Sequence, residues 1–287
     1  MKLIYLLSLF SPGIALTPPP IKEFPEMTET LFKMSRPTTL PRAALASFMG
    51  SAAIHTNTLE NIINPDFILP TTLATGICAN SMIVNDYYDA KLGNDDQNKN
   101  AIVKGDISYN VVKNSLASSY TAIFLASFFL KTPELTALTL FGTFATIIYT
   151  PILKNITFVK NLSVATIVAL TPAIGAIATS DSFYDAFTNP DYRLVNLFVA
   201  IFAGQVHQEL LMDLSDTEND IQAQIKTIPT IFGKEKTVLL SGLMLYIMAF
   251  NACNSEDAIA VYTALAPSIV MFYDASIVKK HIGDPEE

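Results

Sequence analysis

Residues 67–96 read FILPTTLATGICANSMIVNDYYDAKLGNDD, an apolar run that ends in two amides and four carboxylates. A second stretch repeats this arrangement, because the apolar run 194–212 is followed by Asp213, Asp216 and Asp220. Each run has a length suited to a membrane-spanning helix, which needs about 17–25 residues. Oxygen ligands at the ends of two such helices predict a divalent-cation site at a membrane surface.

The composition is that of a membrane protein. Of the 287 residues, 51% are hydrophobic and only 15% are charged, whereas soluble domains carry about 25% charged residues. The mean hydropathy is +0.37. We therefore predict an all-α fold, a polytopic transmembrane helical bundle. Its apolar runs are 40–55, 67–84, 111–130, 135–153, 162–179, 194–212, 237–253 and 258–278.

The charge balance argues against a nucleic-acid partner. The net charge is −8, the pI is about 4.9, and no cluster of lysines and arginines stands out in the sequence. The expected surroundings of the chain are instead a lipid bilayer.

The first residues predict a targeting sequence. Residues 1–15 resemble a signal peptide, with Lys2, an apolar stretch and a small-residue cleavage site. We expect residues 16–31 to be a flexible targeting or linker segment and residues 32–287 to form the transmembrane domain. The arrangement favours a bipartite plastid-targeting sequence, although the three glutamates in residues 21–35 are atypical of one. A secretory signal for the endoplasmic reticulum is the alternative.

Counting helices places the polar motifs on one side of the membrane. Four crossings separate the two acidic motifs, and an even number returns the chain to the same face. Loops expected on that face, 85–110, 154–161 and 213–236, carry eight lysines. The opposite connections carry only Lys131 and Arg193. The positive-inside rule then makes the polar face cytosolic, or stromal in a plastid.

The spacing within each motif suits metal binding. Asn85 and Asp89 are four residues apart, and Asp213, Asp216 and Asp220 follow at intervals of three and four. On a helix each set shares one face, where like charges repel each other unless a cation lies between them. Mg²⁺ prefers carboxylate and phosphate oxygens. The alternatives are ordinary acidic loop residues or the cation site of a transporter, although transporter sites usually lie near the bilayer midplane.

These motifs resemble those of the UbiA superfamily of intramembrane prenyltransferases. The family's N-D-x-x-D stands here as residues 85–89, and its D-x-x-D-x-x-x-D begins at Asp213 and is followed by Thr227-Ile228-Pro229. Its Y-x-x-x-x-K matches Tyr149 and Lys154, and its Arg-Pro matches Arg36-Pro37. The resemblance covers roughly residues 32–280, and since the family usually has nine helices, we expect eight or nine.

The resemblance implies Mg²⁺-dependent transfer of a polyprenyl group from a prenyl diphosphate to a hydrophobic or aromatic acceptor. It implies a catalytic role for Asn85, Asp89, Asp213, Asp216 and Asp220. These residues would hold the metal together with Asp86 and Asp95. The residues expected to bind the diphosphate are Arg36, Lys99, Lys104, Tyr149, Lys154 and Lys226. A cation-coupled transporter or a catalytically inactive family member are the alternatives.

The chain departs from the family pattern at three places. Gly93 stands where many members carry a third aspartate, so Asp95 or Asp96 would have to replace it. The segment 100–105 lacks the arginine of the family's R-P-L-x-x-G. The segment 208–213, QELLMD, is similar to the R-E-I-x-K-D of archaeal ether-lipid members, but its arginine and lysine are replaced. The acceptor therefore stays open between an aromatic compound and a lipid.

Overall fold

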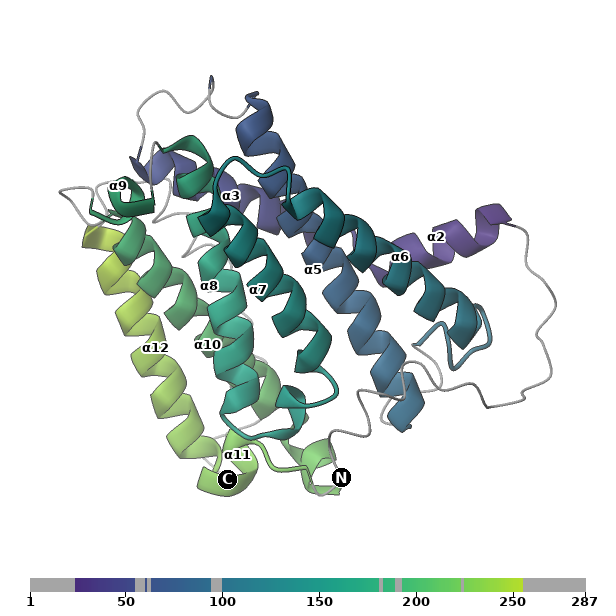
Figure 1. Cartoon of the computed structure of the whole chain (residues 1–287). Coiled ribbons are helices and arrows are strands. Elements are labelled where there is room, and N and C mark those ends of the chain that lie inside the picture. Colours follow the sequence, from purple (N-terminus) through teal and green to yellow (C-terminus); the bar gives the residue numbers. More distant parts are fainter. Residues whose placement is uncertain are drawn as a thin grey trace. The chain divides into compact units, whose positions relative to one another are not determined.

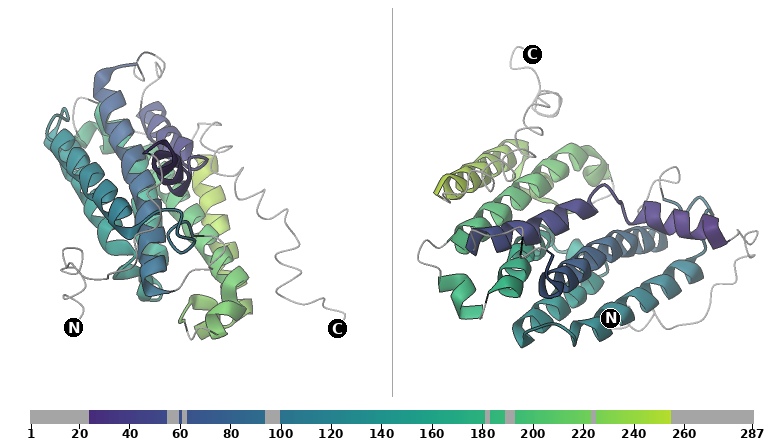
Figure 2. Two further views of the ribbon diagram at one scale, coloured as in Figure 1. Left: turned by 90° about the vertical axis from the view of Figure 1, so that its right-hand side faces the viewer. Right: turned by 90° about the horizontal axis from the view of Figure 1, so that it is seen from above.

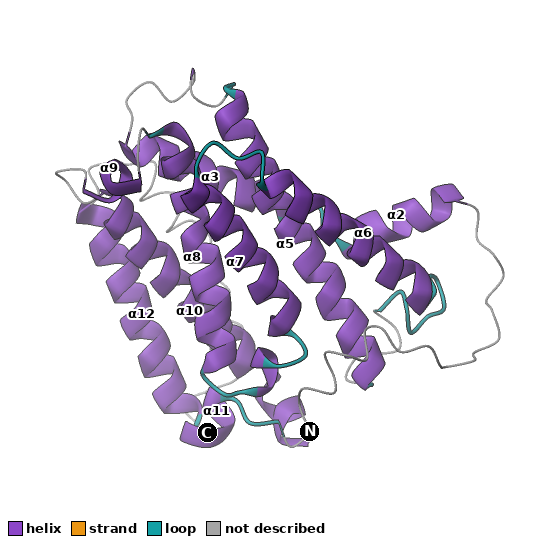
Figure 3. Cartoon of the chain, in the orientation of Figure 1, coloured by secondary structure: helices purple, strands orange, loops and turns teal. Residues whose placement is uncertain are grey.

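The computed structural model describes residues 24–54, 60, 63–93, 100–180, 183–188, 193–222 and 225–254. Every regular element in these ranges is a helix, which confirms the all-α prediction (Figure 3). The expected signal peptide 1–15 and the apolar run 258–278 lie outside the described residues. The helix α2 (Phe24–Met34) overlaps the end of the segment 16–31, so the boundary of the targeting segment stays a prediction.

The chain divides into two compact units. The first consists of Met1–Leu45 with Pro65–Leu153, and the second of Ala46–Asn64 with Lys154–Glu287. The first unit contains α2, the start of α3 (Leu40–Ile54), α5 (Pro65–Leu92), α6 (Tyr109–Ser127) and α7 (Pro133–Tyr149) (Figure 1). The second contains the rest of α3, α8 (Val159–Thr179), α9 (Phe183–Thr188), α10 (Arg193–Gln222), α11 (Ile228–Phe232) and α12 (Lys234–Asn254). A short 3₁₀ helix, η2 (Leu153–Asn155), follows α7.

The predicted count of eight or nine spanning helices is not confirmed. Seven of the apolar runs coincide with α3, α5, α6, α7, α8, α10 and α12, and the described residues contain ten α-helices in all. Of these, α5, α8 and α10 are long and apolar enough to cross a membrane by the combined criteria of length and composition. The other described helices are shorter, less apolar or both. The helix α3, for example, has 15 residues and falls below the usual spanning length.

In the first unit, α5 packs against α6 and α7. Its buried face presents Ile83, Val84, Tyr87 and Tyr88 to a core completed by α6 and by residues of the 100–108 loop. The rings of Tyr87 and Tyr88 meet edge to face at 5.3 Å. Because these two tyrosines point into the core, the polar residues beside them are left at its margin. This packing fixes the rotation of the end of α5.

In the second unit, α10 packs against both α8 and α12 (Figure 2). Ala200 and Ala203 are almost fully buried and pack against Met248 of α12. A turn or more further along, the buried His207 ring places Nδ1 2.7 Å from the hydroxyl of Ser241, which links the same two helices by a polar contact. The long α10 is therefore held on two sides over most of its length.

The second unit also contains a close crossing of α3 and α8. A Cβ atom on Gly50 would lie 1.8 Å from the carbonyl oxygen of Pro172, and one on Gly175 would lie 1.7 Å from that of Ser47. Only glycine allows two backbones to approach this closely. Small residues at such a crossing are typical of helices that pack within a membrane.

Candidate active site

The first acidic motif lies on the last turns of α5. The prediction of a loop that begins at residue 85 is wrong, because the helix continues to Leu92 and ends where Gly93 takes a positive φ of 71°. The Asn85 amide donates a hydrogen bond of 2.8 Å from Nδ2 to Oδ2 of Asp89. This contact confirms that the two residues share one helix face.

Asp86 is held by contacts outside α5. Its Oδ1 lies 3.0 Å from Nη2 of Arg36, which follows α2 and has a positive φ of 51°. The buried Asn100 donates to the carbonyl oxygen of Asp86 at 2.8 Å and accepts from the amide of Ile102 at 2.9 Å. These contacts fasten both α2 and the loop after α5 to the motif. Lys104 lies exposed on the same loop.

The second acidic motif lies within α10. The prediction that a loop begins at residue 213 is also wrong, because α10 runs without interruption to Gln222. Asp213 is buried, whereas Asp216 is exposed and Asp220 is partly buried. The helix therefore carries its carboxylates from the packed interior of the unit to its surface.

Asp213 has two partners from the first turn of α8. Lys160 Nζ donates to Oδ1 of Asp213 at 2.5 Å, and Asn161 Nδ2 donates to Oδ2 at 3.0 Å. The side chains of Lys160 and Asp213 are only 17% and 8% exposed. Oδ1 of Asn161 is buried and has no hydrogen-bond partner among the described residues. The sequence alone did not predict a role for either partner. Lys160 was counted only among the eight lysines of the expected loops.

The remaining predicted binding residues of the described chain lie at helix ends. Tyr149 is the last residue of α7, and Lys154 lies in η2. Lys226 is exposed between α10 and α11, and its carbonyl oxygen accepts a hydrogen bond of 2.7 Å from the hydroxyl of Thr157. This bond ties the segment before α8 to the segment after α10.

Some predicted ligands are not brought together. Asp95 and Lys99 lie outside the described residues. In the part of the chain that the structure describes, no three His, Cys, Asp or Glu side chains gather as a metal site. The first motif belongs to one compact unit and the second to the other. Each motif is therefore a partial set of ligands.

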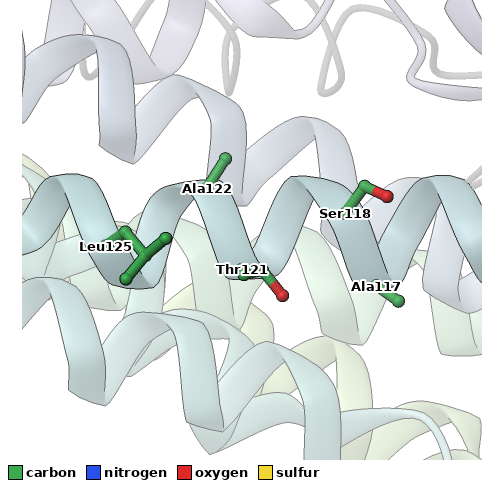
Figure 4. Close-up of a pocket in the computed structure, with 5 residues that line it drawn as sticks. All are labelled: Ala117, Ser118, Thr121, Ala122 and Leu125. Atoms are coloured by element: carbon green, nitrogen blue, oxygen red, sulfur yellow. The ribbon is translucent and has the colours of Figure 1, made fainter.

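A hollow on α6 does not serve as this site. Its lining residues are Ala117, Ser118, Thr121, Ala122 and Leu125, all from one helix (Figure 4). It offers two hydroxyls and no charged group, so it lacks the ligands that a metal or a diphosphate requires.

Comparison with known proteins decides the family. The sequence model of the UbiA prenyltransferase family matches residues 43–285. The chain belongs to this family. It is therefore a multi-pass integral-membrane enzyme, a prenyltransferase.

Two archaeal relatives in the family show what the chain is similar to. The chain is 27% identical to the digeranylgeranylglyceryl phosphate synthase of Pyrococcus abyssi over 207 residues, which cover 71% of this chain and 69% of the relative. It is 23% identical to the enzyme of the same name from Thermococcus gammatolerans, with 87% of each chain covered.

Solved structures show the same fold. A digeranylgeranylglyceryl phosphate synthase structure matches with a TM-score of 0.63 at 14% identity, covering 90% of this chain and 89% of that one. A UbiA homolog from Archaeoglobus fulgidus, bound to GPP and Mg²⁺, matches with a TM-score of 0.62 at 17% identity, covering 85% and 87%.

Proposed function

We propose that this UbiA-family protein transfers a prenyl group from a prenyl diphosphate to a lipid acceptor, with Mg²⁺ as its cofactor. The observation that carries the proposal is the placement of two oxygen-rich motifs on the last turns of two long apolar helices, α5 and α10. A prenyl diphosphate combines a polar head with a long apolar tail, so it suits a site where carboxylates meet a hydrophobic bundle.

The residues present fit a magnesium ion. Their donors are carboxylate and amide oxygens, which Mg²⁺ prefers. Asp213 accommodates a positive charge, since it pairs with the Lys160 ammonium. Oδ1 of Asn161 is a buried acceptor with no hydrogen-bond partner in the described ranges. The residues that would hold the metal are Asn85, Asp89, Asp213 and Asp220, with Asp86, Asp95 and Asp216 as further candidates. When bound, Mg²⁺ would neutralise charge on the diphosphate leaving group.

The chain's own donors would bind the diphosphate. The candidates are Arg36, Lys99, Lys104, Tyr149, Lys154 and Lys226. Charge-assisted hydrogen bonds from such groups to phosphate oxygens are stronger than neutral ones. The apolar faces of the bundle would hold the prenyl tail and keep water away from the reacting carbon.

A lipid acceptor is favoured by the relatives, which are named for a glyceryl phosphate product. An aromatic acceptor is the second candidate. It is kept because residues 208–213 lack the arginine and lysine of the pattern in the archaeal ether-lipid members.

We retain residues 1–15 as a proposed signal peptide, residues 16–31 as a targeting or linker segment, and residues 32–287 as the enzyme domain. The archaeal relatives give no support to a plastid or an endoplasmic-reticulum membrane. The compartment is tested by fusing residues 1–31 to a fluorescent protein and locating the fusion.

The substrate assignment is tested with membranes that contain the expressed protein. They are incubated with labelled prenyl diphosphates of several lengths and with a glyceryl phosphate ether lipid or aromatic acceptors, and products are identified by mass spectrometry. We expect a prenylated lipid. If the only prenylated product is aromatic, the acceptor is an aromatic compound and not a lipid. The absence of any prenylated product would refute the proposed function.

A further inference from the structure

Lys160 occupies an unusual position for a cation. It is the second residue of α8, where the partial positive charge of the helix N-terminus disfavours a positively charged side chain. Its Nζ nevertheless lies 2.5 Å from Oδ1 of Asp213. The carboxylate, and not the stability of α8, therefore explains why a lysine is accommodated there.

The two oxygens of Asp213 are held in different ways. Oδ2 accepts from Asn161, a residue that is only 1% exposed and whose short side chain is fixed by its surroundings. Oδ1 accepts from Lys160, whose long flexible stem allows the ammonium to swing away. Asn161 can thus keep the carboxylate oriented while Oδ1 exchanges its partner.

We infer that Lys160 is an internal counter-ion, which occupies Asp213 in the metal-free protein and is displaced when Mg²⁺ binds. The released ammonium then donates to the diphosphate that arrives with the metal. The inference rests on the proposed function, since it takes Asp213 as a metal ligand. No covalent bond is made or broken, because the metal ion replaces the Lys160 ammonium as the ionic partner of one carboxylate oxygen.

This exchange has a consequence that a permanent ion pair lacks. A lysine that competes with the metal weakens the binding of metal alone, and one that moves to the diphosphate strengthens the binding of diphosphate. Removing its charge should therefore change the two affinities in opposite directions. A lysine that serves only to fold the unit would change neither in this way.

The test uses the full-length protein in detergent and the metal alone. Binding of Mn²⁺, a paramagnetic substitute for Mg²⁺, is titrated by electron paramagnetic resonance for wild type, Lys160→Met and Lys160→Gln. We expect both variants to bind Mn²⁺ about tenfold more tightly, because both lose the competing charge. The glutamine can still donate a hydrogen bond, so Lys160→Gln provides the measurement if Lys160→Met folds poorly. Lys234→Met is the control, since Lys234 pairs with the exposed Glu218 at 3.3 Å.

A second titration adds inorganic pyrophosphate to metal-saturated protein. We expect both Lys160 variants to bind it several-fold more weakly, and Lys234→Met to match wild type. Unchanged or weaker Mn²⁺ binding in both Lys160 variants would overturn the exchange, and unchanged pyrophosphate binding would overturn the transfer of Lys160 to the diphosphate. Failure of the proposed function would be seen separately, as wild-type protein that binds Mn²⁺ but forms no prenylated product.

Discussion

Arg36 and Asp86 form an ion pair, with 3.0 Å between Nη2 and Oδ1. Sequence reasoning assigned the arginine to the diphosphate and the aspartate to the metal. Their contact joins the end of α2 to the first acidic motif and neutralises one of its charges. Asp86 follows Asn85 in the sequence, but the next position on a helix points about 100° away from it. Asp89, by contrast, bonds directly to Asn85.

This pairing predicts unequal roles for the two aspartates. Asp89→Asn should lower kcat about 100-fold or more, because it weakens a proposed metal ligand that would stabilise charge in the transition state. Asp86→Asn should lower it less than about tenfold, since an exposed ion pair contributes little. Initial rates of prenyl transfer on equal amounts of folded protein compare them. Equal losses in the two variants would show that Asp86 is as important to the chemistry as Asp89.

Asn100 predicts a structural effect. Its buried side chain bonds to the carbonyl of Asp86 and to the amide of Ile102. Asn100→Ala should lower the free energy of unfolding by about 1–3 kcal/mol, because the buried amide of Ile102 and the partly buried carbonyl of Asp86 lose this partner. Thermal unfolding in detergent measures the change. Asn110→Ala is the matched control, since Asn110 lies exposed on α6; a similar loss in both variants would argue against the role of Asn100.

The crossing of α3 and α8 predicts intolerance of added methyl groups. Gly50→Ala and Gly175→Ala each place a Cβ less than 2 Å from a backbone carbonyl oxygen. Overpacking of this kind costs about 1–3 kcal/mol or more, since backbone cannot rotate away. Gly242→Ala is the control, because a Cβ there meets nothing within 4 Å. Unfolding temperatures should fall for the first two variants and hold for the third. Unchanged temperatures for Gly50→Ala and Gly175→Ala would mean that the helices do not cross this closely.

The positions of the motif-bearing helices could be predicted from the sequence, but their ends could not. The apolar runs located α5 and α10, and the four-residue spacing predicted that Asn85 and Asp89 share one helix face, which their hydrogen bond confirms. Polar residues that follow an apolar run are typical of a loop. A helix can nevertheless continue through them, because its backbone hydrogen bonds do not depend on the polarity of the side chains. Both helices therefore extend through their acidic motifs. The first of them, α5, ends where Gly93 takes a positive φ.

The partners of Asp213 could not be predicted from local spacing. Lys160 and Asn161 lie 53 and 52 residues before it in the sequence, and they reach it only because α8 packs against α10. A lysine and an asparagine ahead of an apolar run are common features of a loop. Their role follows from tertiary packing, which no periodicity in one chain encodes.

The most direct test of the account is the metal dependence of product formation. Purified protein is treated with EDTA, supplied with a labelled prenyl diphosphate and the lipid acceptor, and then titrated with Mg²⁺. Asp213→Asn and Asp89→Asn are run beside wild type, with folding checked by thermal unfolding. We expect no prenylated product in EDTA, full recovery of wild type with Mg²⁺, and little recovery of either variant. Undiminished product formation by wild type in excess EDTA would contradict this expectation.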